Sequence, residues 1–378
     1  MVRKILIAIF GILLGTLVGY LLSYYSPIST PFTPKTKKQV IGFIPYWLLD
    51  KAQTDYSKYI TTLTYFGLRV DDNGNILKLT TPQQEEPGWY ALESGKLDPF
   101  FKNAKQEKVS LSLLIDSGSV PAIDSLVSDP ILHADNLAFD VSKVMNKYDF
   151  SDLNLDIEYT SQASPEARVN FTKFVSEVKK KLPNNTLTIE VAPGDVIKQN
   201  LIDISAVSKI ADNIVIMAYD FHSTSSFVTG PVAPLNGAGV MSEYDVTSAA
   251  ENALKSVPSK KLILGIPLYG YEWESLGSVP RSAIIPNSGV VASNARAQEL
   301  LASCTSCALH SDTQAVEQYI SYFDNNSGTN HILFYPNDKS TDAKLKLAKT
   351  LNLEGVALWA LGYEGNNILS PITGYKNQ

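Results

Sequence analysis

Short runs of apolar and β-branched residues recur along the chain from residue 39 onward, and segments with helical spacing separate them. Runs of this length and composition predict β-strands, and their alternation with helices is typical of repeated βα units around a parallel sheet. Eight runs qualify as strands. They are residues 40–45, 60–67, 109–115, 153–158, 186–192, 213–219, 261–267 and 355–360. The clearest helical segments between them are 136–147 and 166–181, where apolar residues recur every three or four positions.

Eight βα units predict a closed (β/α)8 barrel, the TIM-barrel architecture of the α/β class, which a chain of 378 residues can form as one domain. The competing fold is a doubly wound open sheet. No glycine-rich phosphate-binding loop follows the first strand, as that fold would require for a nucleotide site. We therefore expect a barrel over residues 39–378.

The gap between the seventh and eighth predicted strands is longer than a single helix requires. It contains a strand-like run at residues 331–335 and a helix-like run at 294–303. These pieces predict a small α+β insertion at about residues 270–340.

The first residues of the chain have the pattern of a membrane anchor. Arg3 and Lys4 precede an uncharged apolar run from residue 5 to about residue 25. A helix of this length, at about 1.5 Å per residue, spans the roughly 30 Å hydrocarbon core of a bilayer. The sequence therefore predicts an N-terminal transmembrane helix within residues 1–25, with the rest of the chain outside the cytoplasm because the basic pair precedes the span. The alternative is a signal peptide whose cleavage would release a secreted protein. Residues 26–38, rich in Pro, Ser, Thr and Lys, predict an extended linker.

Charge, histidine and cysteine patterns exclude several classes of function. The net charge is −6 and the basic residues form no stripe with interleaved aromatics, so we expect no nucleic-acid partner. The four histidines lie far apart without metal-site spacing, so we expect no metal and no other cofactor. Cys304 and Cys307 form a CxxC pair, which in an exported chain we expect to be a small loop disulfide rather than a redox site. A monomer is expected, although the sequence alone does not determine the oligomeric state.

The fourth predicted strand, LNLDIEY at residues 153–159, carries its polar residues on one face. Side chains two positions apart in a strand point the same way, so Asn154, Asp156 and Glu158 lie together. In a barrel this face is the interior, and Glu158 falls at the carboxyl end of the strand, where active sites of this architecture lie. Charged side chains are rarely buried unless they are paired, which favours a functional site. The alternative interpretation is an edge strand with a solvated acidic face.

The octet SDLNLDIE at residues 151–158 resembles the signature DGxDxDxE of the family 18 glycoside hydrolases, chitinase-like barrel enzymes that act on N-acetylglucosamine-containing glycans. The last Asp and the Glu of the signature are present as Asp156 and Glu158. Asn154, at the middle Asp, resembles the peptidoglycan-directed and spore-cortex-lytic branch of the family. Further segments resemble family motifs in the expected order. They are residues 217–222 with the loop 229–235, residues 265–270, and residues 355–362.

The resemblance implies a role for each matching residue. Glu158 would be the general acid and base, and Asp156 would orient the acetamido group of the substrate while its charge raises the pKa of Glu158. Tyr219 would hold the acetamido oxygen, and Trp359 would stack beneath the sugar ring. The residues expected to bind the sugar are Asp220, Trp359, Asn154, Tyr46 and Tyr269.

The resemblance therefore implies a hydrolase of β-1,4-linked N-acetylglucosamine-containing polysaccharides, either peptidoglycan or chitin. Its mechanism would be retaining and substrate-assisted, with the acetamido oxygen of the substrate as nucleophile. Ser151 and Asp152 depart from the signature and keep a second interpretation open, a catalytically silent chitinase-like lectin that binds the same glycans. The sequence distinguishes neither the two polymers nor internal from chain-end cleavage.

Overall fold

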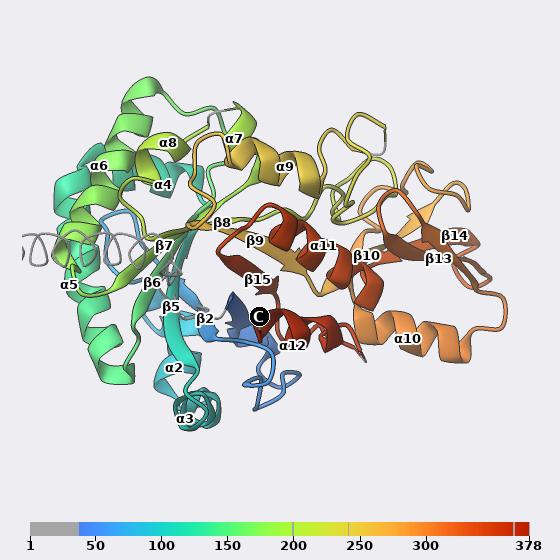
Figure 1. Cartoon of the computed structure of the whole chain (residues 1–378), viewed down its shortest axis with the longest axis horizontal. Helices are drawn as coiled ribbons and strands as arrows, with labels where there is room; N and C mark the ends of the chain where they lie inside the picture. Colours follow the sequence, from blue (N-terminus) through green and yellow to red (C-terminus); the bar gives the residue numbers. More distant parts are fainter. Residues whose placement is uncertain (1–37, 199, 241, 366, 378) are drawn as a thin grey trace, which may run out of the picture. The chain divides into compact units, whose positions relative to one another are not determined.

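The computed structural model describes residues 38–198, 200–240, 242–365 and 367–377. In this part of the chain eight parallel strands close into a barrel in the order β1-β15-β9-β8-β7-β6-β5-β2 (Figure 1). The barrel strands are β1 (Gln39–Pro45), β2 (Thr62–Arg69), β5 (Ser110–Ser117), β6 (Asp152–Ile157), β7 (Thr186–Val191), β8 (Asn213–Ile216), β9 (Leu262–Pro267) and β15 (Gly355–Trp359). Each barrel strand pairs with its neighbours in chain order, and the first strand β1 pairs with the last strand β15. The expected (β/α)8 barrel is therefore confirmed. A short hairpin of β3 (Leu79–Thr81) and β4 (Gln84–Glu85) follows β2.

Helices follow the barrel strands along the chain. They are the short 3-10 helix η1 (Tyr46–Leu48), α2 (Pro87–Glu93), α3 (Asp98–Gln106), α4 (Val120–Ser128), α5 (Pro130–Tyr148), α6 (Pro165–Lys181), α7 (Pro193–Lys198), α8 (Ile204–Val207), α9 (Val246–Ala253), α11 (Asp338–Thr350) and α12 (Ser370–Lys376). The side chains of Asp129 and Ser164 cap α5 and α6 by accepting the N–H groups of Leu132 and Ala167. A proline follows each cap, at the first helical position, where the missing N–H leaves no hydrogen bond unmade.

The larger core lies between the barrel and the helices. The apolar stripe of the segment predicted at 166–181 forms part of it, because Phe171, Phe174, Val175 and Val178 of α6 are fully buried. These side chains recur every three or four positions and so lie on one face of the helix, directed at the sheet.

Inside the barrel, apolar and polar side chains share the space. A small apolar cluster contains Ile41, Phe43, Leu114, Val215, Ile263 and Ala357. Strands β6 and β7 contribute buried polar side chains instead, among them Asp152, Asn154, Thr188 and Glu190. Asp152 accepts hydrogen bonds from Ser112 Oγ at 2.5 Å and from Thr188 Oγ1 at 2.9 Å. The barrel interior therefore holds acidic groups that are largely removed from solvent.

Between β9 and α11 the chain forms a five-stranded antiparallel sheet in the order β11-β10-β14-β13-β12. Its elements are β10 (Tyr269–Ser275), β11 (Val290–Ser293), α10 (Asn294–Ser303), β12 (Ala308–Asp312), β13 (Glu317–Asp324) and β14 (Thr329–Tyr335). This is the α+β element expected at about residues 270–340, and α10 has the bounds of the helix-like run 294–303. In Figure 1 the labelled β13, β14 and α10 lie to one side of the barrel strands.

The buried carboxylate of Glu317 links this insertion to segments of the barrel domain. Glu317 of β13 accepts the backbone N–H groups of Val232 and Ala233 at 2.9 and 2.8 Å. The Nζ atom of Lys344 in α11 lies 3.8 Å from the same carboxylate, and both side chains are fully buried. The contact joins three segments that are distant in sequence, so the insertion is held against the loop that follows β8.

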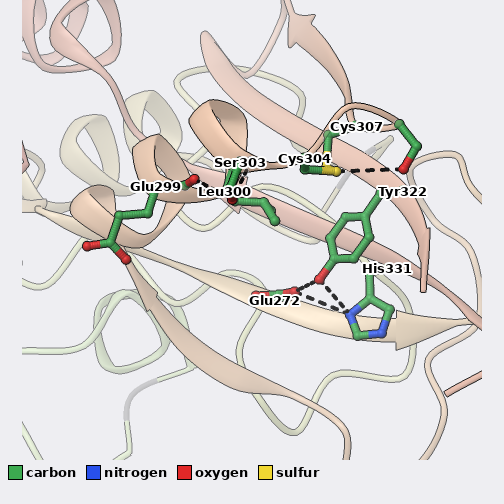
Figure 2. Close-up of a disulfide and its surroundings, with 9 residues drawn as sticks. Glu272, Glu299, Leu300, Ser303, Cys304, Cys307, Tyr322 and His331 are labelled. Carbon is green, nitrogen blue, oxygen red and sulfur yellow. Dashed lines mark hydrogen bonds and ion pairs between the residues drawn. A yellow bond between two sulfur atoms is a disulfide. The ribbon is translucent and has the colours of Figure 1, made fainter. Parts of the chain in front are cut away.

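Cys304 and Cys307 form a disulfide, with an S–S distance of 2.04 Å, between the end of α10 and the start of β12. Figure 2 shows it above a polar group in which Glu272 accepts a hydrogen bond from the Tyr322 hydroxyl and lies 3.2 Å from Nδ1 of His331. The pair is thus bonded, as expected of a small loop disulfide.

In the part of the chain that the structure describes, no helix is both long enough and apolar enough to cross a membrane. The anchor predicted within residues 1–25 and all of the predicted linker except Lys38 lie outside the described residues.

Candidate active site

A pocket of about 370 Å³ lies at the carboxyl ends of the barrel strands, in the size range of small-ligand sites. Its lining residues are Phe43, Phe66, Leu114, Asp156, Glu158, Glu190, Ala192, Pro193, Met217, Tyr219, Asp220 and Trp359. Five of the residues singled out from the sequence therefore meet at one pocket, although they come from three separate regions of the chain. They are Asp156, Glu158, Tyr219, Asp220 and Trp359.

The three polar residues predicted on one face of the fourth strand lie at different depths. Asn154 is fully buried in the barrel interior and does not line the pocket, whereas Asp156 lines it and is only 5% exposed. Glu158 follows the last residue of β6 and is exposed to the pocket. Its backbone N–H donates to the carbonyl of Ser117 at 2.9 Å, which fixes the chain where the strand ends.

The pKa of Glu158 is raised, first by its burial between the pocket walls and then by the negative charge of Asp220. The direction of this shift agrees with the prediction, but its leading cause differs, since the sequence had suggested Asp156 as the source. The pKa of Asp156 is itself raised well above its usual range by burial, and next by the charges of Glu158 and Asp116. A raised pKa favours the protonated form of Glu158, which is the form that a general acid requires.

Asp220 is oriented by two tyrosines of β10. Its carboxylate accepts hydrogen bonds from the hydroxyls of Tyr269 and Tyr271, the latter at 2.9 Å. The backbone of Asp220 adopts a left-handed conformation with φ at 59°, which Asp tolerates better than most residues. Burial raises the pKa of Asp220, and the two tyrosine hydrogen bonds oppose that shift. The hydroxyl of Tyr269 is thus engaged with Asp220 in a buried position, which leaves it a supporting role beneath the pocket.

Aromatic rings form one wall of the pocket. Trp359, the last residue of β15, contacts Phe66 edge to face with ring centroids 4.8 Å apart and Phe43 at 5.8 Å. Trp47 adds a further edge contact to Trp359 at 6.3 Å and is 45% exposed. Tyr46 packs against Trp47 at 4.9 Å but does not line the pocket. The neighbouring rings fix the indole of Trp359, which stays partly exposed in the lining of the pocket.

A second hollow of about 460 Å³ shares the lining residues Asp156 and Glu158 with the first. Arg69 and Asp116, which also line this hollow, form an ion pair at 3.5 Å. Burial raises the pKa of Asp116 to about 7. Glu158 therefore lies where the linings of the two hollows meet.

Sequence reasoning missed Glu190, which lines the pocket from β7. The signal was available, because Thr186, Thr188 and Glu190 alternate with apolar residues just as the polar residues of β6 do. Phe66 was also missed, because its apolar character gave no sign of a pocket, and Met217 was quoted within the motif 217–222 without being named as a site residue. In the described ranges no group of three or more His, Cys, Asp or Glu side chains is placed to hold a metal ion.

Comparison with known proteins agrees with this arrangement. The profile of the family described as glycosyl hydrolases family 18 matches residues 30–364. The cortical fragment-lytic enzyme of Bacillus subtilis is 24% identical over 324 residues, which cover 83% of this chain and 67% of that protein. The crystal structure of the Group IV chitinase of Ostrinia furnacalis has a TM-score of 0.76 at 19% identity, covering 90% of this chain and 100% of that one. A variant chitinase of Cycas revoluta in complex with (GlcNAc)4 has a TM-score of 0.73 at 21% identity, with coverage of 90% and 100%.

Proposed function

The chain belongs to the glycosyl hydrolases of family 18, and on that premise we propose that it cleaves β-1,4-linked N-acetylglucosamine-containing glycans, peptidoglycan or chitin, with retention of configuration. The observation that carries the proposal is the convergence of Asp156, Glu158, Tyr219 and Trp359 on one pocket at the barrel mouth. Two relatives support the substrate class. One is a cortical fragment-lytic enzyme, and the other is a chitinase that binds (GlcNAc)4.

In the first step Glu158 gives its proton to the oxygen of the glycosidic bond as that bond breaks. The acetamido carbonyl oxygen of the same sugar forms a new bond to the anomeric carbon, giving a positively charged oxazolinium ring. Asp156 accepts the acetamido N–H and stabilises this charge, and the Tyr219 hydroxyl donates to the acetamido oxygen to direct its attack. Burial strengthens both interactions, because the local dielectric constant is lower than that of water.

In the second step the deprotonated Glu158 takes a proton from a water molecule, whose oxygen attacks the anomeric carbon. The bond from the acetamido oxygen breaks, the acetamido group is restored, and Glu158 regains its proton. Two displacements at the same carbon leave the product in the configuration of the substrate. Glu158 can accept and return this proton because it is exposed to the pocket.

The alternative of a catalytically silent lectin is not supported, since the named relatives are enzymes and this chain retains both Asp156 and Glu158. Anchoring through residues 1–25 stays a prediction from the sequence, as does the position of the barrel outside the cytoplasm. Membrane fractionation of the full chain tests both. Recovery in the membrane fraction, with the barrel accessible to external protease, supports the anchor, and recovery in the medium supports the secreted form.

The experiment that tests the function uses the purified chain with two substrates, N-acetylglucosamine oligomers and purified peptidoglycan. Mass spectrometry of the products identifies the bond cleaved and separates internal from chain-end cleavage. New reducing ends at N-acetylglucosamine with either substrate support the proposal and name the preferred polymer. No cleavage of either substrate, by a protein that is folded and binds the oligomers, contradicts it.

A further inference from the structure

Glu190 lies beside Asp156 in the barrel interior. Strands β6 and β7 pair in parallel with Leu155 opposite Ile189, so the next residues along the two strands are Asp156 and Glu190. Both side chains line the same pocket, and Glu190 is 3% exposed. Adjacent parallel strands lie about 4.8 Å apart, which brings two carboxyl groups on one face within reach of each other.

Most of the carboxyl oxygens in this pair have no hydrogen-bond partner among the described residues. In the described part of the chain, both carboxyl oxygens of Glu190 and Oδ1 of Asp156 are buried without a hydrogen bond to another protein group. A buried carboxylate without a hydrogen-bond donor is costly, so at least one of the pair has to carry a proton. The proton would supply the hydrogen bond that both groups need.

The charges that surround Glu190 are all of one sign. Burial raises its pKa well above the usual range, and the charges of Asp156, Asp152 and Glu158 add to the shift, while the side-chain amide of Asn154 opposes it. Burial raises the pKa of the Tyr219 hydroxyl well above its usual range, and the nearby carboxyl groups of Glu190 and Asp156 add to the shift. Within the described residues, no cation is among the groups that act on Glu190. Both carboxyl oxygens of Glu190 lack a hydrogen-bond partner, whereas only Oδ1 of Asp156 does, and this difference assigns the proton to Glu190.

We propose, as an inference that rests on the proposed function, that Glu190 is a positioning residue whose protonated carboxyl donates a hydrogen bond to Oδ1 of Asp156. This bond stabilises Asp156 as the anion that the acetamido N–H of the substrate requires. One proton and one negative charge are then shared between the two groups. The family signature has an acidic residue at the position of Asn154 on β6. In this chain Glu190 on the neighbouring strand β7 supplies that carboxyl instead.

The decisive test is the pH dependence of kcat/KM for Glu190→Ala on an N-acetylglucosamine oligomer. Loss of the donor raises the pKa of Asp156, so activity on the acidic side is lost at a higher pH. We expect the acidic limb to move up by about one to two pH units and the maximal kcat/KM to fall about 10- to 100-fold, the scale of a hydrogen bond to a charged group. An acidic limb that stays in place overturns the inference, whatever the change in rate.

Two rescue variants separate this role from packing. Glu190→Gln keeps an N–H donor of the same shape, and we expect its acidic limb to match that of the wild type. The double variant Asn154→Asp with Glu190→Ala moves the carboxyl from β7 to β6, two positions from Asp156 on the same face. We expect the acidic limb of its pH profile to return to the wild-type position. If Glu190→Ala does not fold, the double variant decides. A folded double variant with the wild-type limb supports the inference, and a folded one without activity overturns it.

The matched control is Glu177→Ala, which removes a buried carboxyl of α6 that pairs with Lys180 outside the barrel. We expect a lower unfolding temperature and an unchanged acidic limb. Wild-type protein that cleaves neither substrate would instead contradict the proposed function, so the two failures are distinct.

Discussion

Asp156 is buried in the barrel, whereas Glu158, two positions further along the chain, is exposed to the pocket. The end of β6 at Ile157 produces this difference, because Glu158 has left the strand ladder. A buried carboxyl can orient a substrate group but cannot exchange protons freely with water. An exposed one can do both, so the difference in depth supports the proposal that Glu158 carries out the proton transfers.

Replacing Glu158 by Gln preserves the shape of the side chain and removes the transferable proton. We expect kcat on N-acetylglucosamine oligomers to fall at least about 100-fold, the scale of general acid catalysis, with KM little changed. Steady-state kinetics measure both constants. Unchanged turnover in the variant would exclude Glu158 as the acid.

Replacing Asp220 by Asn removes the charge that, after burial, raises the pKa of Glu158. Without that charge the pKa of Glu158 falls, so the acid loses its proton at a lower pH. We expect the alkaline limb of the pH profile of kcat/KM to move to lower pH. An alkaline limb that does not move would contradict the coupling between the two carboxyl groups.

Asp156→Asn tests orientation of the acetamido group instead. The amide carbonyl of Asn can still accept the acetamido N–H but carries no negative charge to stabilise the positive intermediate, so we expect kcat to fall by at least about tenfold. Oligomer binding, measured by calorimetry, should weaken much less. A variant that loses binding and turnover equally would show that Asp156 binds the ground state as strongly as the transition state, which would contradict the proposed role.

Trp359 is expected to bind the sugar ring through stacking. Trp359→Phe keeps an aromatic ring against Phe66 but presents a smaller face, and we expect kcat/KM to fall by about 2- to 12-fold. Trp47→Phe, at a ring outside the pocket lining, is the comparison variant and should change kcat/KM less. Equal effects at the two positions would argue against a stacking role for Trp359.

Asp152 should make the stability of the protein depend on pH. Burial raises its pKa to about 6 in the folded chain, above the value of about 3.9 expected when unfolded. Its contribution is therefore fully present below pH 4 and is lost as the pH rises through 6. In the wild type, Asp152 lowers the free energy of unfolding by about 2–3 kcal/mol as the pH rises from 4 to 7. We expect the Asp152→Asn variant to lack this part of the pH dependence. Urea denaturation at pH 4, 5, 6 and 7 measures it, and identical pH dependence in both proteins would refute the assignment.

The local pattern of the sequence predicted the barrel because each βα unit carries its own signal. Strand β9 and helix α10 lie where the apolar runs placed them, to within a residue. The end of β8 at Ile216 differs from the predicted 219, since residues 217–219 remain apolar after the ladder ends. Periodicity reports side-chain type and does not report where pairing with a neighbouring strand stops.

The local pattern could not predict which residues of different strands lie side by side. The position of Glu190 beside Asp156 depends on the register of β6 against β7, which no single segment encodes. The same holds for Tyr271, whose hydroxyl reaches Asp220 from the first strand of the insertion. The depth of Asn154, which was expected at the sugar, also follows from closure of the barrel around it.

The account as a whole depends on the substrate acting as its own nucleophile beside Glu158. Proton NMR of the first product released from an N-acetylglucosamine oligomer, recorded before the anomers equilibrate, tests this most directly. The account predicts that the β-anomer forms first and that the α-anomer grows in later. An α-anomer that accumulates first would mean a single displacement by water and would contradict the mechanism.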